Sequence, residues 1–207
     1  MLIACSTRSL YCWESGEDTP STRGTRSGLV GLSGVTADSN RDSGIRINNA
    51  GSVSVTNGSA SSNGFDGLIA STISGAITIS GGSYNSNGAV DANGDGIAIT
   101  MAAFTVSLTN VTANSNSDDG FVGANITSAV SVSGGTFNNN GAGTATGDGI
   151  QLVNVGAVTF TNGVNAIGND PGVLISGALS FSDTDGVFTD NDDHGIQLVD
   201  IAGSVTL

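Results

Sequence analysis

Short runs of alternating hydrophobic and polar residues recur along most of the chain. One set follows a glycine and places an aliphatic residue on either side of one other residue: Gly44–Ile47, Gly67–Ala70, Gly96–Ile99, Gly149–Leu152 and Gly195–Leu198. A second set begins seven to ten residues later and alternates apolar residues with Ser or Thr: Val53–Val55, Ile77–Ile79, Val106–Leu108, Val130–Val132, Val158–Phe160, Leu179–Phe181 and Val205–Leu207. Alternation with a period of two predicts short β-strands, each with one buried face.

An asparagine stands shortly before each coil glycine, and successive asparagines are 22 to 29 residues apart: Asn40, Asn63, Asn87, Asn116, Asn140, Asn169 and Asn191. Three residues before each asparagine stands one further inward residue, which predicts a third short strand: Ala37, Ala60, Tyr84, Ala113, Phe137, Ala166 and Phe188. A repeat of this length indicates a stack of about seven coils, in which each strand pairs in parallel with its equivalent one coil away. We expect the asparagines to form a structural ladder of stacked side-chain amides.

The repeated Asn-x(3–9)-Gly-Φ-x-Φ spacing over residues 28–207, where Φ is apolar, resembles the right-handed parallel β-helices of the pectate-lyase-like superfold. The resemblance implies an all-β, single-stranded right-handed parallel β-helix (a β-solenoid). The superfold includes polysaccharide lyases, glycoside hydrolases, phage tailspikes and the stalks of bacterial adhesins. The fold alone therefore does not choose among these activities.

Residues 1–27 lack the repeat, and we interpret them as a non-repeat leader outside the fold. The repeats start in the middle of a coil near Gly28 and stop within a second strand, at Leu207. Because a solenoid needs polar caps at its ends, we expect residues 28–207 to be a β-helix truncated at both ends, with neighbouring coils in a longer parent chain.

Composition narrows the range of partners. The chain has 32 Gly, five Arg, no Lys and 18 acidic residues, for a net charge of −13. Nucleic acid and anionic lipid are excluded as partners, because both need basic residues to neutralise phosphate. No apolar run approaches the ~20 residues that cross a bilayer, so membrane insertion is not expected. The acidic balance favours a secreted or cell-surface location. Both cysteines precede the repeats, so no disulfide framework is expected to hold the coils together.

Four consecutive coils carry an aspartate directly before the glycine: Asp66, Asp95, Asp119 and Asp148. Stacking would place these carboxylates roughly 5 Å apart along the axis. That spacing suits oxygen ligands for Ca²⁺ and the carboxylate pair of a retaining glycosidase. Asp-Gly also makes a tight polar turn into a strand. Ca²⁺ is the one cofactor that the sequence suggests, and the row is its candidate metal site.

The segment 182–195 is similar to conserved pieces of polygalacturonases. Thr184-Asp185 matches Asn-Thr-Asp, Asp192-Asp193 matches Asp-Asp, and His194-Gly195 matches His-Gly. In that family these pieces lie about one coil apart, whereas here they fall within one coil, and the family's Arg-Ile-Lys is absent. The spacing therefore predicts no catalytic residue in this segment.

Two surfaces are candidates for contact with a partner. The outward residues of the second strands form a grid of hydroxyl groups, resembling the Thr-x-Thr faces of ice-binding β-solenoids, although seven of the twelve positions are Ser. The threonines of this grid are Thr56, Thr78, Thr109, Thr159 and Thr161. The outward residues Ile69, Ala98 and Val122 of the first strands form an apolar stripe that would fit a sugar face or a partner strand.

From these features we expect a non-catalytic β-helix segment of a large secreted or surface-exposed bacterial protein. An adhesin or stalk of this kind would bind carbohydrate or another surface weakly. The uniform repeats favour this reading. The alternative is a carbohydrate-active β-helix enzyme, a lyase or a glycoside hydrolase, that uses the aspartate row with Ca²⁺. Ice binding through the hydroxyl grid is the third possibility.

Overall fold

The computed structural model describes residues 3–6, 9–14, 28–141 and 147–207. The described residues form two sheets and contain no helix, so none that could span a membrane. The first sheet contains β1 (Ile3–Ser6), β2 (Ser9–Glu14), β4 (Ile45–Asn48), β6 (Leu68–Ile73), β8 (Ile97–Ala102), β10 (Phe121–Ile126), β12 (Ile150–Val155), β14 (Val173–Ser176) and β16 (Ile196–Val199). The second contains β3 (Leu29–Ser33), β5 (Ser52–Thr56), β7 (Ile77–Ser80), β9 (Val106–Thr109), β11 (Val130–Ser133), β13 (Ala157–Thr161), β15 (Ser180–Ser182) and β17 (Val205–Thr206).

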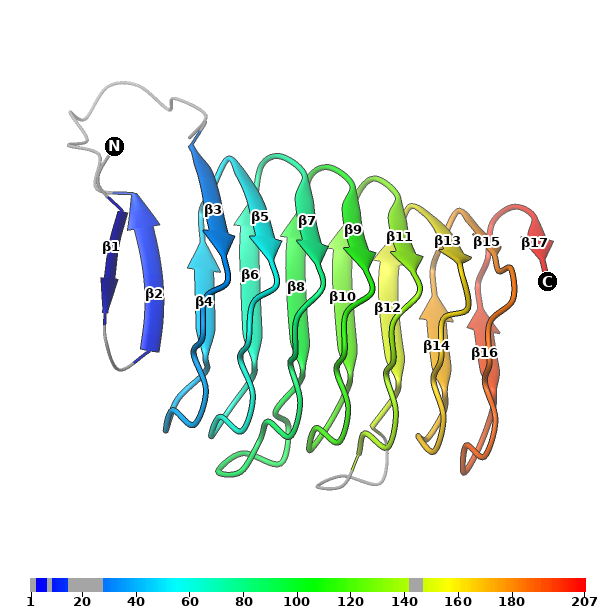
Figure 1. The fold of residues 1–207 in the computed structure, drawn as a ribbon. Coiled ribbons are helices and arrows are strands. Elements are labelled where there is room, and N and C mark those ends of the chain that lie inside the picture. Colours follow the sequence, from blue (N-terminus) through cyan, green and yellow to red (C-terminus); the bar gives the residue numbers. More distant parts are fainter. Residues whose placement is uncertain (1–2, 7–8, 15–27, 142–146) are drawn as a thin grey trace.

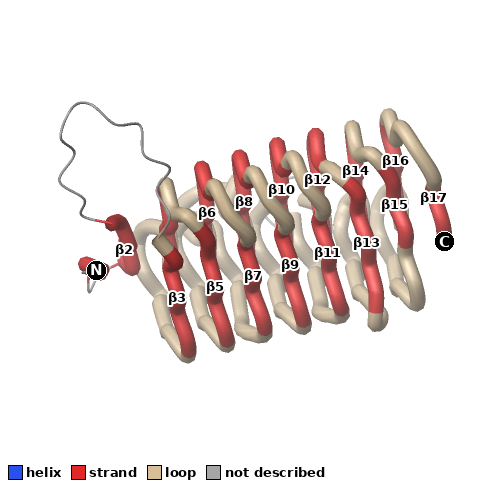
Figure 2. The backbone as a smooth tube through the Cα atoms, turned by 90° about the horizontal axis from the view of Figure 1, so that it is seen from above, coloured by secondary structure: helices blue, strands red, loops and turns tan. Residues whose placement is uncertain are grey.

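The chain winds from one sheet to the other, and the coils stack in sequence order from β3 to β17 (Figures 1 and 2). From β2 onward every strand pairs in parallel with its equivalent in the next coil; in β8 and β10, for example, Ile97 lies opposite Phe121. This arrangement confirms the all-β parallel β-solenoid of about seven turns. Its right-handed sense and its likeness to the pectate-lyase type stay predictions.

The third predicted strand is reduced to one β-bridge per coil, such as Thr112 with Thr136. At the amino-terminal end β1 pairs with β2 in antiparallel fashion, and β2 lies alongside β4. Residues 15–27 lie outside the described residues, and the division of the chain at residue 28 stays a prediction.

The core is a single column of apolar side chains between the two sheets. Alternate strand residues point into it, and the bridge column adds residues such as Tyr84 and Phe137, which are fully buried. Phe160 and Phe181 stack edge to face with ring centroids 5.3 Å apart. Leu179, by contrast, was expected to point inward but is 61% exposed. Phe181, and not Leu179, lies opposite Val158, so the register expected for this strand was wrong by two residues.

Candidate functional site

The asparagine ladder runs through all seven coils and confirms the structural role predicted for its members. At each step one Oδ1 accepts both the backbone N–H and the Nδ2–H of the asparagine in the preceding coil. Asn116 Oδ1, for example, lies 3.0 Å from Asn87 N and 3.0 Å from Asn87 Nδ2. The remaining steps join the other members in the same way: Asn40 to Asn63, Asn63 to Asn87, Asn116 to Asn140, Asn140 to Asn169 and Asn169 to Asn191.

The ladder also explains the glycine that precedes the strands of the first sheet from β4 to β14. A Cβ built on Gly96 would lie 2.7 Å from Asn116 Nδ2 and 2.6 Å from the carbonyl oxygen of Gly120. Any larger residue would push the buried amide out of its place, so glycine and asparagine are required together.

A second polar ladder lies two residues before the first, and sequence reasoning missed it. Each of its side chains accepts the backbone N–H of the equivalent residue in the next coil. Asn85 Oδ1 accepts from Asn114 N at 2.7 Å, and Asn114 Oδ1 accepts from Asn138 N at 2.7 Å. Asp38 and Ser61 make the corresponding bonds in the earlier coils. The repeated Asn-x-Asn spacing was its signal in the sequence.

The four aspartates predicted as a row do lie in one column. Asp66 Oδ1 accepts from Asp95 N at 3.0 Å, Asp95 Oδ1 from Asp119 N at 3.1 Å, and Asp119 Oδ1 from Asp148 N at 2.7 Å. The first three carboxylates thus accept a hydrogen bond from the turn of the following coil. The row is a third ladder, in which carboxylates replace amides.

Burial raises the pKa values of these carboxyls, and repulsion from neighbouring carboxylates adds to the effect. The pKa of Asp95 rises to about 8, that of Asp119 to about 9 and that of Asp148 to about 7. The pKa of Asp66 is also raised by burial, although Arg46 opposes the shift. Asp119 and Asp148 are only 4% and 1% exposed. Near neutral pH Asp95 and Asp119 therefore hold protons, unlike exposed aspartates.

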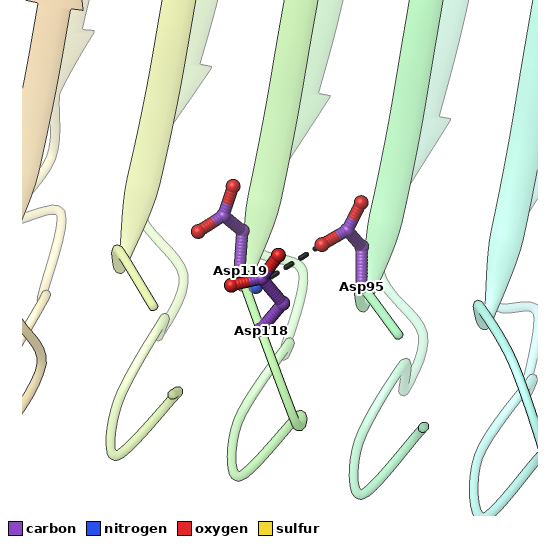
Figure 3. Close-up of side chains that lie close together, drawn as sticks. All are labelled: Asp95, Asp118 and Asp119. Carbon is purple, nitrogen blue, oxygen red and sulfur yellow. Dashed lines mark hydrogen bonds between the residues drawn. The ribbon is translucent and has the colours of Figure 1, made fainter. Parts of the chain in front are cut away.

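Asp118 joins this row from the side (Figure 3). One carboxylate oxygen from each of Asp95, Asp118 and Asp119 lies within 4.8 Å of the others. Oxygen donors gathered in this way suit Ca²⁺. The group contains Asp118, which sequence reasoning did not select, and not Asp66 or Asp148. Binding of Ca²⁺ stays a prediction.

The carboxylate ladder ends at Asp148 for a chemical reason. The equivalent residue in the next coil is Pro171, as the bond from Gly149 N to the Pro171 carbonyl shows. Proline has no N–H, so it cannot make the bond that the other three carboxylates accept. Asp148 Oδ2 instead accepts a hydrogen bond from Gln151 Nε2 at 3.0 Å.

Next to this ladder end lies a shallow groove of about 360 Å³, which we call the acidic groove. It crosses the starts of β12, β14 and β16, and its lining is Asp118, Asp148, Gln151, Asp170, Pro171, Leu174, Asp193 and Gln197. Four carboxylates, two amides and two apolar side chains provide hydrogen-bonding groups and a small apolar surface. Of its lining residues, Asp148 belongs to the predicted aspartate row, and Leu174 is an outward residue of the first sheet. It includes Asp118 and Asp170, which sequence reasoning missed although each stands two residues before a coil glycine.

The polygalacturonase-like pieces do not converge on this groove. Thr184 and Asp185 follow β15 of the second sheet, whereas Asp193 and His194 precede β16 of the first. Only Asp193 lines the groove, and its Oδ2 lies 2.7 Å from His194 Nδ1.

The hydroxyl grid lies on the outer face of the second sheet. One column contains Thr56, Ser80, Thr109, Ser133 and Thr161, so threonine alternates with serine along it. The other threonines, Thr78 and Thr159, are separated by Ser107 and Ser131. Neighbouring strands therefore never place two threonine methyl groups side by side in these columns, and surface binding by the grid stays a prediction.

In comparisons with known proteins, no family model, curated protein or solved structure matches the chain.

Proposed function

We propose that this chain is a non-catalytic β-helix segment of a secreted or cell-surface protein and that it contacts carbohydrate weakly through the acidic groove. The observation that carries the proposal is the lining of that groove. Carboxylates and the amides of Gln151 and Gln197 match the hydroxyl groups of a sugar, and Leu174 offers an apolar patch to the C–H face of a ring.

The rest of the molecule supports a role as a rigid, repetitive stalk. The asparagine ladder bonds each coil to the next, and the other two ladders reinforce part of the stack. The groove is one local feature on otherwise similar coils. A solenoid of this type gains stability from nearest-neighbour contacts, so a stalk can be long without a large globular core. The net charge of −13 keeps such a surface soluble and suits an extracellular location.

A second candidate is a carbohydrate-active enzyme that uses the same groove. Asp148 favours it, because burial raises its pKa to about 7 while it stands beside other carboxyls. Glycosidases pair a carboxylic acid held protonated near neutral pH with an ionised carboxylate. Asp148 would then donate the proton, and Asp118 or Asp170 would act as the base.

Binding and turnover assays on the purified chain separate the two candidates. Acidic and neutral polysaccharides are tested for retention in affinity electrophoresis and for release of reducing ends or unsaturated products. We expect neutral polysaccharides to retain the chain, acidic ones to do so less because the groove is itself acidic, and neither to yield product. Turnover that is abolished by Asp148→Asn would replace the stalk by the enzyme. Turnover that survives this change but is lost with His194→Ala would instead make the polygalacturonase-like pieces catalytic.

A further inference from the structure

We infer that the acidic groove selects glycans that carry protonated amino groups, that is, polymers of amino sugars with free amines. The inference rests on the proposed function, because it names the class of carbohydrate that the groove would take. Three features of the described residues carry it: the charge of the lining, the broken ladder at Asp148 and the apolar patch.

The lining has four carboxylates and no Lys or Arg. The cationic side chains of the repeat region are Arg41 and Arg46, and both lie in the coil of β4, several coils from the groove (Figure 1). His194 contacts one lining residue, Asp193. A uronate, sulfate or phosphate group would meet unscreened negative charge here, whereas an ammonium group is attracted.

Asp148 gives a second and independent reason. It is 1% exposed, lines the groove, and accepts a hydrogen bond from Gln151 Nε2, but it lacks the backbone N–H that the next coil supplies to the other carboxylates, because that coil has Pro171. A buried carboxylate gains most from a donor that also carries positive charge, since charge-assisted hydrogen bonds are about twice as strong as neutral ones. A ligand ammonium group would supply both the hydrogen bond and the positive charge.

The remaining lining distinguishes a sugar from a basic peptide. Leu174 and Pro171 form an apolar patch, and the amides of Gln151 and Gln197 both donate and accept hydrogen bonds. A pyranose ring presents an apolar face and hydroxyl groups in one rigid unit, so it can use both. The groove crosses three strands at ~4.8 Å spacing, which gives about 10 Å along the axis and favours a stretch of polymer over a single sugar.

The test compares oligosaccharides of equal length by titration calorimetry with the whole chain. The ligands are an oligomer of glucosamine, its fully N-acetylated counterpart and an oligogalacturonate. We expect the glucosamine oligomer to bind about tenfold or more tightly than the N-acetylated one and to weaken as salt screens the charges. Asp170→Asn should reduce this binding several-fold. Asp200→Asn is the matched control, because Asp200 is exposed, lies outside the groove and has the backbone conformation (φ 52°) that Asn tolerates.

Each other result overturns a defined part of the proposal. Equal binding of the two glucosamine-based oligomers, or preference for the oligogalacturonate, would refute selection for amines but leave carbohydrate binding in place. A lysine-rich peptide of equal charge that binds as tightly would refute recognition of a sugar. Absence of binding by every glycan, with the circular dichroism spectrum unchanged, would refute both this inference and the proposed function.

Discussion

Replacing Asn116 by Ala tests the ladder where it is most buried. Asn116 lies in the middle of the stack and is 0% exposed. Its Oδ1 accepts the backbone N–H and the Nδ2–H of Asn87, and its Nδ2 donates to Asn140 Oδ1 at 3.0 Å. Alanine removes all three hydrogen bonds and leaves a small cavity.

The magnitude follows from the groups that lose a partner. Asn140 Oδ1 keeps one bond, from the backbone N–H of residue 116 at 3.0 Å. The two donors of Asn87 lose their acceptor in a site that is 2% exposed. Each unsatisfied buried donor costs about 1–3 kcal/mol, and part of this is regained by relaxation. We therefore expect the free energy of unfolding to fall by about 2–4 kcal/mol.

Urea-induced unfolding, followed by circular dichroism, measures this loss as a lower midpoint at unchanged slope. Asn93→Ala is the control, because Asn93 is exposed and its side chain bonds only Asp91 among the described residues. The control should change stability by no more than about 0.5 kcal/mol. If Asn116→Ala shifts the midpoint no more than the control does, the ladder is not a source of stability.

Three further predictions concern the buried polar groups. Burial raises the pKa of Asp119 to about 9, so the folded chain holds a proton that the unfolded chain releases near pH 4. Thermal stability should therefore fall as pH rises from about 4 to about 9, and Asp119→Asn should flatten this profile; parallel profiles would contradict it. Millimolar Ca²⁺ should raise the melting temperature, and EDTA should reverse the rise. If the ion binds the group of Asp95, Asp118 and Asp119, Ca²⁺ should not change the melting temperature of Asp118→Asn. Tyr84→Phe should leave stability unchanged or raised, because the buried hydroxyl of Tyr84 has no hydrogen-bond partner among the described residues. A loss above about 1 kcal/mol in urea melts would reveal such a partner.

The coil architecture was predictable because several local signals agree. Period-two alternation gives each strand an inner face, and an asparagine followed within a few residues by a glycine marks the same turn in every coil. Register at β15 was not predictable in this way. Leu179 and Phe181 alternate like the equivalent pair Val158 and Phe160, but a shift of two residues preserves the alternation, so periodicity alone cannot detect it. The pairing of β12 with β14 and that of β13 with β15 have the same residue offset. This register places Phe181 opposite Val158 and leaves Leu179 outside.

The candidate site was only partly predictable. The aspartate row was found because its members share one position before the glycine, and parallel stacking turns that position into a column. Asp118 and Asp170 stand one residue earlier, at a position that is also Asp in two other coils (Asp42 and Asp193) and Phe or Gly in the rest. No spacing in the sequence connects them with Gln151 or Leu174. Their convergence depends on which side chains project from neighbouring coils into one groove, and only the three-dimensional structure shows this.

The position before the coil glycine shows how a uniform solenoid can acquire a local site. From the first coil to the last it is occupied by Ser43, Asp66, Asp95, Asp119, Asp148, Pro171 and His194. Where an aspartate is followed by another aspartate, the backbone N–H of the second engages the carboxylate of the first, and both serve the fold. Where Pro171 follows Asp148 that donor is missing, and the acidic groove lies at this break. The proline that ends the ladder thus removes the backbone donor of Asp148, whose Oδ2 bonds Gln151 instead, without disturbing the Asn140–Asn169 step beside it. The proposed binding role therefore follows from the interruption of a ladder that stabilises the coils before it.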